Sequence, residues 1–231
     1  MGTYLIVGAS SGIGRQTALQ LAQNGHTVYG TYNNTKVDSD NSRIIYNALN
    51  VLDEQLVLDF LPDTIDGIVY CPGTISLRPF KRINPADFVA DYQLQVIGAI
   101  KVIQAALSKF KGGGTSSILL FSTVAVRMGL SFHTQVACSK GAIEGLTRSL
   151  ASELAPGIRV NCIAPSLTDT PLAAGLINTA QKIEANAERH PLKRIGSSED
   201  IANMAEFLLS DKASWITGQV LHVDGGIGSI K

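Results

Sequence analysis

The sequence lacks the features that mark a membrane, secreted or nucleic-acid-binding protein. No uninterrupted apolar stretch reaches the ~18 residues that suggest a membrane span. The chain has 19 basic and 19 acidic residues, and neither sign gathers in a block, which argues against nucleic acid and anionic membranes as main partners. A strand-like run begins at Thr3 and leaves no room for a signal peptide. We therefore expect a cytoplasmic protein.

Cysteine is scarce as well. Cys71, Cys138 and Cys162 are an odd and widely spaced set, which is typical of reduced thiols in a cytosolic protein. The sequence therefore predicts neither a disulfide framework nor a cysteine-ligated metal site, and we expect no metal.

What the sequence does contain is a regular alternation of short apolar runs and helical stretches over residues 1–231. Most of the runs are continuously apolar, as in strands that are buried on both faces of a parallel sheet. One connection, Asn33–Ser42, is too short and polar for a good helix. The pattern predicts a single α/β domain with a doubly wound parallel sheet of about seven strands, of the Rossmann type. The expected strands are Tyr4–Val7, Thr27–Tyr32, Arg43–Leu49, Gly67–Cys71, Ser117–Ser122, Ile158–Ile163 and Gln219–Val223.

A glycine-rich turn follows the first of these strands directly, and a helix follows the turn. Glycine allows a tight turn there, and it lets backbone N–H groups and the positive end of the helix approach a pyrophosphate. The turn therefore predicts nucleotide binding. The residues concerned are Gly8, Ser10, Ser11, Gly12, Ile13 and Gly14.

Several motifs, in the same order along the chain, resemble the short-chain dehydrogenase/reductase family. The turn is similar to the family's T-G-x-x-x-G-x-G, with Val7 in place of the threonine. Arg159–Ser166 resembles R-V-N-x-I-x-P-G, and Ile216–Gln219 with Val223–Gly226 resembles the C-terminal signature. The resemblance covers nearly the whole chain and implies an oxidoreductase that binds a nicotinamide dinucleotide and a small-molecule substrate.

The resemblance also assigns further cofactor positions. Asn50 and Val51 stand where many members have Asp-Val near the adenine, and Cys71 and Gly73 lie in the stretch equivalent to the family's N-N-A-G. The residues that members place at the nicotinamide correspond to Pro165, Thr168 and Thr170.

The end of the second strand bears on the choice of dinucleotide. Members that prefer NAD place an acidic side chain there to hold the adenosine ribose, and this chain has Tyr32 instead. Asn33, Asn34, Lys36 and Arg15 could all donate to a 2′-phosphate. We therefore expect NADP(H) to be preferred, with NAD(H) possible.

The catalytic pattern of the family is only partly present. Ser139-Lys140-Gly141-Ala142 resembles the S-K-x-A that follows the family's proton-donating tyrosine, so Lys140 takes the position of the ribose-holding lysine. The tyrosine position is Val136, and the earlier tyrosine position of a related enoyl-reductase branch is Ala125. The serine and asparagine positions of the family correspond to Thr123 and Gln95.

Another residue would therefore have to supply the proton. His133 is one candidate, because an imidazole exchanges protons near neutral pH, although a surface-loop histidine is an alternative reading. A second candidate is Cys138, which could act as a thiol acid or could alternatively be a packing cysteine. The third candidate is Lys140 itself.

Two functions fit these residues. The first is an NADP(H)-dependent oxidoreductase that acts on a small carbonyl or enone with a degraded proton-relay site. The alternative is a catalytically weak or inactive protein that binds or senses the dinucleotide.

Two further expectations concern the outside of the site. Residues 172–191 follow a cofactor motif and read either as a mobile lid over an apolar cleft or as a fixed amphipathic helix. A homotetramer is expected through pairing of the long helices at Pro85–Phe110 and Ala137–Leu154, as in the resembling family. The apolar residues expected at that contact are Tyr92, Val96, Ile103, Leu107, Ile143, Leu146 and Leu150.

Overall fold

All seven expected strands form, and they lie parallel in one sheet. The computed structural model describes residues 1–38, 41–111 and 116–230. The sheet has the order β3-β2-β1-β4-β5-β6-β9, so the Rossmann-type prediction of about seven strands is confirmed. The strands are β1 (Thr3–Val7), β2 (Thr27–Tyr32), β3 (Ile44–Ala48), β4 (Gly67–Tyr70), β5 (Ser116–Phe121), β6 (Ile158–Pro165) and β9 (Val220–Val223).

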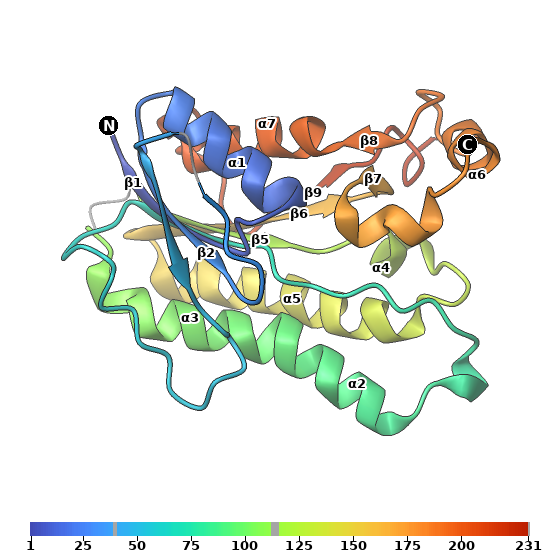
Figure 1. Ribbon diagram of the computed structural model, residues 1–231, viewed down its shortest axis with the longest axis horizontal. Coiled ribbons are helices and arrows are strands. Elements are labelled where there is room, and N and C mark those ends of the chain that lie inside the picture. The colour runs from blue at the N-terminus through green and yellow to red at the C-terminus, as the bar shows by residue number, and fades with distance from the viewer. Residues whose placement is uncertain (39–40, 112–115, 231) are drawn as a thin grey trace.

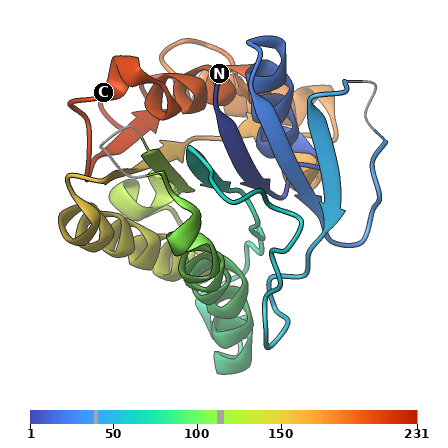
Figure 2. The ribbon, with the colours of Figure 1, turned by 90° about the vertical axis from the view of Figure 1, so that its left-hand side faces the viewer.

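Helices cover both faces of this sheet (Figures 1 and 2). One face carries α1 (Gly12–Gln23) and α7 (Ser198–Leu209), and the other carries α2 (Pro85–Tyr92), α3 (Gly98–Ala106) and α5 (Thr134–Leu154). The remaining helical segments are α4 (Val124–Met128), α6 (Ala180–Glu188), η1 (Phe80–Arg82), η3 (Leu107–Lys109), η4 (Pro171–Leu176) and η5 (Asp211–Ala213). Within the described residues, no helix is long and apolar enough to cross a membrane.

The apolar pattern of the central strands places a core on each face of the sheet. Successive strand side chains point to opposite faces, so Tyr4 and Ile6 of β1 pack on the α1–α7 side, whereas Leu5 and Val7 pack on the other. Four of the five residues of β1 are buried, as are all residues of β4 and β5. Burial on both faces explains why these runs show no alternation of polar and apolar residues.

The two edge strands are less buried than their apolar sequences suggested. Ile45 of β3 is 42% exposed, and all four residues of β9 are only partly buried. Each has a neighbouring strand on one side only. The β2–β3 connection, expected at Asn33–Ser42, contains no helix in its described part; residues 39–40 lie outside the described residues.

A π-turn, η2 (Gln93–Ile97), joins α2 and α3 into one long helical run. Such turns are rare and occur frequently at functional sites. The Tyr70 hydroxyl at the end of β4 donates to the Leu94 carbonyl at 2.5 Å, and Gly98 has no room for a Cβ atom beside that hydroxyl. These contacts hold the turn against the carboxyl end of β4, and Gln95 on it is fully buried.

The apolar faces of the long helices serve the core of the subunit more than an outside contact. Val96, Ile103 and Ile143, which we had expected at a subunit contact, are each at most 3% exposed. They pack in the core on this face of the sheet, so they are not available to a partner. Tyr92 and Leu107 remain exposed at about two-fifths of their surface.

A second, two-stranded parallel sheet was not predicted. It pairs β7 (Thr168–Asp169) with β8 (Gly196–Ser197). Two residues per strand are too few to produce a recognisable periodicity, so only the tertiary structure could show this pairing.

Candidate active site

An open cleft runs along the carboxyl ends of β1, β2 and β4. It lies where the chain winds outward in both directions from β1 and β4, which is the usual place for a ligand in an open α/β sheet. Most of the residues predicted to bind a cofactor line this cleft. They are Gly8, Ser10, Ser11, Gly12, Ile13, Gly14, Tyr32, Asn33, Asn50, Val51, Cys71, Gly73 and Thr170.

Four predicted cofactor residues lie outside the lining of the cleft. Asn34 is exposed beyond the end of β2, Pro165 ends β6, and Thr168 is buried at the start of β7. Lys140 lies on α5, but its Nζ atom would be 3.7 Å from a Cβ atom on Gly73, which does line the cleft.

The glycine turn has the backbone geometry that its sequence suggested. Gly8 and Gly12 have φ of 80° and 53°, a region that favours glycine. A Cβ atom on Gly14 would overlap with the carbonyl oxygen of Gly8. The turn is tied to β2, because the backbone N–H of Ala9 donates to the Thr31 carbonyl at 2.8 Å.

The turn delivers the N-terminus of α1 to the cleft. Ser11 precedes the helix in an extended conformation, and its side chain makes no capping hydrogen bond; the first turn of α1 contains no acidic residue. The first N–H groups of a helix have no partner within it and carry partial positive charge. This end of α1 therefore fits the pyrophosphate of a dinucleotide.

The adenosine end of the cleft has no carboxylate among its described lining residues. Tyr32 is partly buried there, and Asn33 is exposed. Arg15, exposed on α1, acts electrostatically on Tyr46, whose hydroxyl donates to the Ala9 carbonyl at 3.2 Å. Burial raises the pKa of Tyr46, and the positive charge of Arg15 opposes that rise. A cation on the first turns of α1 therefore acts on a tyrosine that is hydrogen-bonded to the glycine turn.

Two of the predicted catalytic side chains converge at the other end of the cleft. A Cβ atom on Gly73 would lie 3.3 Å from Gln95 Oε1 and 3.7 Å from Lys140 Nζ. Val136 lies one helical turn before Lys140 on α5 and is 7% exposed. Its side chain is apolar, so it cannot exchange a proton.

Burial and nearby groups act on Lys140 in opposite directions. Burial lowers the pKa of its ammonium group, whereas Cys162, Asp91 and Cys71 raise it. Burial also raises the pKa of both thiols to about 12, so Cys71 and Cys162 stay protonated at neutral pH.

Asp91 is a residue of this site that we did not predict. Its carboxylate is 4% exposed and accepts hydrogen bonds from Gln95 Nε2 at 2.7 Å, from Ser139 Oγ at 2.5 Å and from Thr74 Oγ1. The signal in the sequence is its spacing, because residues four apart on a helix share a face, and Asp91 stands four residues before Gln95.

The other candidate site residues have different surroundings. Thr123 precedes α4, and its Oγ1 accepts from the Ala125 N–H at 3.3 Å. His133 precedes α5, with Nδ1 2.7 Å from the Ser131 carbonyl oxygen, and does not line the cleft in the described part of the chain. Cys138 is exposed, which excludes the alternative of a packing cysteine. Nowhere in residues 1–38, 41–111 and 116–230 are three or more His, Cys, Asp or Glu side chains placed to hold a metal ion.

Comparison with known proteins agrees with this geometry. Residues 8–228 match the family described as enoyl-(acyl carrier protein) reductase, and similar solved structures include a short-chain dehydrogenase family protein from Francisella tularensis, with a TM-score of 0.87 and 27% identity over 98% of each chain. The chain belongs to the short-chain dehydrogenase/reductase family. Members of this family use NAD(P) cofactors.

Two further relatives of this family are similar over nearly the full chain. The 3-oxoacyl-[acyl-carrier-protein] reductase of Thermotoga maritima is 32% identical over 238 residues, which cover 96% of each chain. The structure of ElxO with NADP bound has a TM-score of 0.88 and 25% identity, and covers 98% of this chain and 99% of that one. The chain is thus an oxidoreductase of the short-chain dehydrogenase/reductase type.

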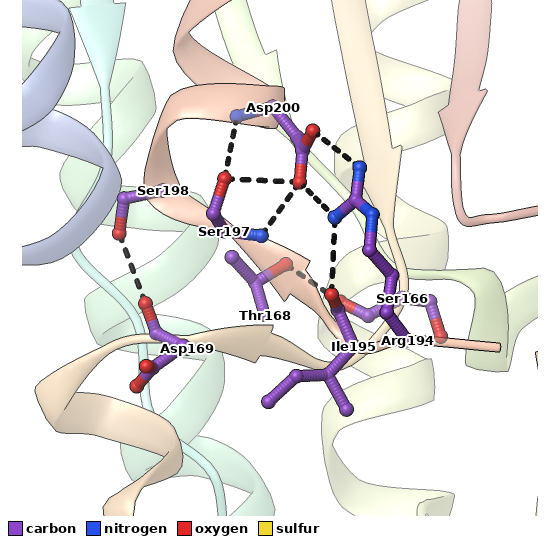
Figure 3. A network of polar contacts seen from close by, with 8 residues as sticks. All are labelled: Ser166, Thr168, Asp169, Arg194, Ile195, Ser197, Ser198 and Asp200. Atoms are coloured by element: carbon purple, nitrogen blue, oxygen red, sulfur yellow. Dashed lines mark hydrogen bonds and ion pairs between the residues drawn. The ribbon is translucent and has the colours of Figure 1, made fainter. Parts of the chain in front are cut away.

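In this member of the family, the small β7–β8 sheet closes the base of the segment that we predicted to be a lid. Figure 3 shows Asp200, at the start of α7, accepting two hydrogen bonds from the Arg194 guanidinium at 2.6 and 2.8 Å and one from the Ser197 N–H at 2.7 Å. Ser198 Oγ reaches across to the Asp169 carbonyl at 3.0 Å. These contacts fix both ends of the segment beside each other.

His190, for which no sequence pattern had indicated a role, adds another anchor. It is 3% exposed, and its Nε2 is 2.8 Å from Ser166 Oγ at the end of β6. Between the anchors Ala173 is buried, whereas α6 has no buried residue and Leu172, which lines the cleft, is 52% exposed.

The contact between Gly14 and Gly8 predicts the effect of adding one methyl group. Gly14→Ala forces α1 away from the end of β1, and we expect it to lower the free energy of unfolding by about 1–3 kcal/mol and to abolish nucleotide binding. Gly175→Ala is the control, because nothing lies within 4 Å of the added atom. Urea denaturation followed by circular dichroism, with NADPH fluorescence titration, measures both effects; equal stability and affinity in the two variants would contradict this packing.

Proposed function

We propose that the protein is a cytoplasmic NADP(H)-dependent oxidoreductase that acts on a small carbonyl or enone. The observation that carries this proposal is the convergence of Lys140 Nζ and Gln95 Oε1 on Gly73, at the end of a cleft that begins with the glycine turn. A reaction at the nicotinamide needs polar side chains at the end of the groove that is far from the glycine turn, and these two side chains lie there.

Each part of the cofactor has residues that suit it. The turn and the N-terminus of α1 suit the pyrophosphate, and the Lys140 ammonium group suits the hydroxyls of the nicotinamide ribose. When bound, the nicotinamide exchanges a hydride with the substrate. The other proposed contacts are Asn50 and Val51 at the adenine, Cys71 and Gly73 along the groove, and Pro165, Thr168 and Thr170 at the nicotinamide.

The choice of NADP(H) rests on charge. A carboxylate at the end of β2 would repel a 2′-phosphate, and none lines the described part of the cleft. Asn33, Asn34 and Lys36 are exposed there, and Arg15 lies near the turn. These side chains donate hydrogen bonds or carry positive charge, so they favour the phosphate over a free hydroxyl.

Two side chains on the substrate side of the site differ in polarity. Val136 presents only methyl groups, whereas Thr123 offers a hydroxyl that can orient a substrate oxygen. Residues 172–191, fixed at their base by β7 and β8, are proposed to close over the substrate and exclude water.

Val136 is also the observation that favours a second candidate function. Without a phenol at this position, the cleft would serve a protein that binds or senses the dinucleotide with little or no turnover. Mixing the protein with NADPH and a panel of ketones, aldehydes and enones, while cofactor absorbance is followed, separates the two. Consumption of NADPH supports the enzyme, and binding without consumption supports the sensor.

The cofactor preference gives a direct prediction. NADPH should bind more tightly than NADH, and Tyr32→Asp should shift the preference toward NADH, because the new carboxylate repels the 2′-phosphate and accepts from the ribose hydroxyls. Titration of each cofactor, followed by thermal stability, measures the four affinities. Asp introduced at Thr35, an exposed position in the same loop, is the control for added charge. Equal or tighter binding of NADH by the unmodified protein would remove the argument.

Because Val136 has no hydroxyl group, a tyrosine at this position is predicted to increase the activity. Val136→Tyr places a phenol one helical turn before Lys140, and general acid catalysis contributes about 10²–10⁴-fold in typical enzymes. We expect reduction of simple ketones to begin or to rise, with Val136→Phe as the matched control without the hydroxyl. His133→Ala, measured beside them, tests His133 as the surrogate acid. Brisk native turnover with no gain from Val136→Tyr would contradict this account of the site.

A homotetramer is proposed as well, with one contact through the long helices. Val89, Tyr92 and Leu107 leave large apolar side chains exposed along α2 and η3, and a two-fold contact would bury the same patch on both subunits. Sedimentation velocity at micromolar concentration is expected to show a tetramer. Tyr92→Lys and Leu107→Lys together should weaken it, and a stable monomer of the unmodified protein would count decisively against it.

A further inference from the structure

Asp91 is a buried carboxylate that joins three separate parts of the candidate active site. Its hydrogen-bond donors are Thr74 from the loop after β4, Gln95 from the π-turn and Ser139 from α5. Burying a carboxylate is costly unless several donors and a positive charge compensate for it. Asp91 has three such donors, from three separate segments of the chain.

Asp91 also acts electrostatically on Lys140, whose pKa it raises. The groups that act on Lys140 are Asp91 from α2, Cys71 from the end of β4 and Cys162 from β6. Burial keeps both thiols protonated at neutral pH. Asp91 is therefore the one carboxylate among the described groups that act on this ammonium group.

Gln95 shows how the carboxylate orients the site. Its Nε2 is held by Asp91 at 2.7 Å, which turns Oε1 toward Gly73, where Lys140 Nζ also points. Gln95 Oε1 is buried and has no hydrogen-bond partner among the described residues. A buried acceptor without a described partner lies with the Lys140 ammonium group directly behind Gly73, which lines the cleft, so both can interact with a group that binds at Gly73.

We propose that Asp91 is the positioning residue that compensates for the missing phenol, by favouring the ammonium form of Lys140 behind Gly73 of the cleft. Lys140 then is the proton donor of the site, and Gln95 Oε1 orients the group that receives or relays the proton. This inference rests on the proposed function for its reaction, but the electrostatic effect of Asp91 on Lys140 is measurable with or without turnover.

The reaction step balances with these groups alone and the cofactor. A bound reduced nicotinamide would supply a hydride to the carbonyl carbon of the substrate, and the π electrons of the C=O bond would move to the oxygen. That oxygen takes a proton from Lys140 Nζ, so one N–H bond breaks and one O–H bond forms. The products are an alcohol, the oxidised nicotinamide and a neutral Lys140 amine, which regains a proton from water.

Titration of Lys140 tests the electrostatic effect of Asp91 without any substrate. Protein labelled with ¹³C at the lysine Cε atoms gives one resonance for Lys140, assigned by its loss in Lys140→Arg. We expect Asp91→Asn to lower the titration midpoint of Lys140 by about one pH unit or more, because a nearby opposite charge favours the charged form. Asp87→Asn, one turn earlier on α2 and paired with Arg78, should leave the midpoint near its wild-type value.

A second variant separates charge from packing. Ser139→Ala removes one hydrogen bond to Asp91 but keeps the carboxylate, so the midpoint of Lys140 should stay near its wild-type value. Asp91→Glu should also preserve it. A midpoint that is the same in Asp91→Asn and wild type, or that falls as far in Ser139→Ala, would overturn the proposal.

The pH dependence of kcat for carbonyl reduction tests the donor role. Reduction requires protonated Lys140, so the rate should fall as pH rises through its pKa, and Asp91→Asn should move that fall to lower pH. Lys140→Gln should lose at least tenfold in kcat beyond any change in NADPH affinity. Wild-type turnover whose pH profile is unmoved by Asp91→Asn would overturn the donor role. NADPH binding without turnover, with a Lys140 midpoint that Asp91→Asn shifts, would instead reject the proposed enzyme and retain the effect of Asp91 on Lys140.

Discussion

The close approach of α1 to the end of β1 is the constraint on which the cleft depends. Gly14 lies against the Gly8 carbonyl with no space for a side chain, so the helix axis points its N-terminus at the groove rather than past it. The same turn is tied to β2 through Ala9. The position of the positive helix end, the depth of the groove and the place where the other strands deliver their polar residues are all set by this one backbone contact.

The two halves of the site are built in different ways. At the half that fits the dinucleotide, the binding groups are mostly backbone groups, because the turn and the end of α1 present N–H groups rather than side chains. At the other half, side chains from distant parts of the chain meet, and a buried carboxylate, Asp91, joins three of them. A few glycines specify the backbone geometry of the first half. A single substitution can change the side-chain cluster of the second half without altering the backbone, and Val136 lies in that half.

The sequence predicted the layers of the fold well, because burial on both faces leaves long apolar runs that periodicity detects. It also identified the lining of the cleft, since the turn is a local feature. It did not reveal the β7–β8 pairing or the contact of His190 with Ser166, because both join residues far apart in the chain. Asp91 was missed because its signal in the sequence, the four-residue spacing from Gln95, does not show that the face they share is turned inward. The apolar stripe of the long helices was assigned to a subunit contact. Periodicity shows that such a face is covered, but it does not show whether the subunit's own core or a second subunit covers it.

The β7–β8 sheet has a consequence for how such a protein can change over evolution. Because the two strands lie side by side, the chain leaves the main body and returns to it at nearly the same point, and the 26 residues between Asp169 and Gly196 form a closed excursion. Lengthening or shortening such an excursion alters loop-closure entropy only slowly and leaves the register of the seven-stranded sheet untouched. The length and sequence of the segment between β7 and β8 can therefore change during evolution, while the strands that carry the nucleotide groove are conserved in structure.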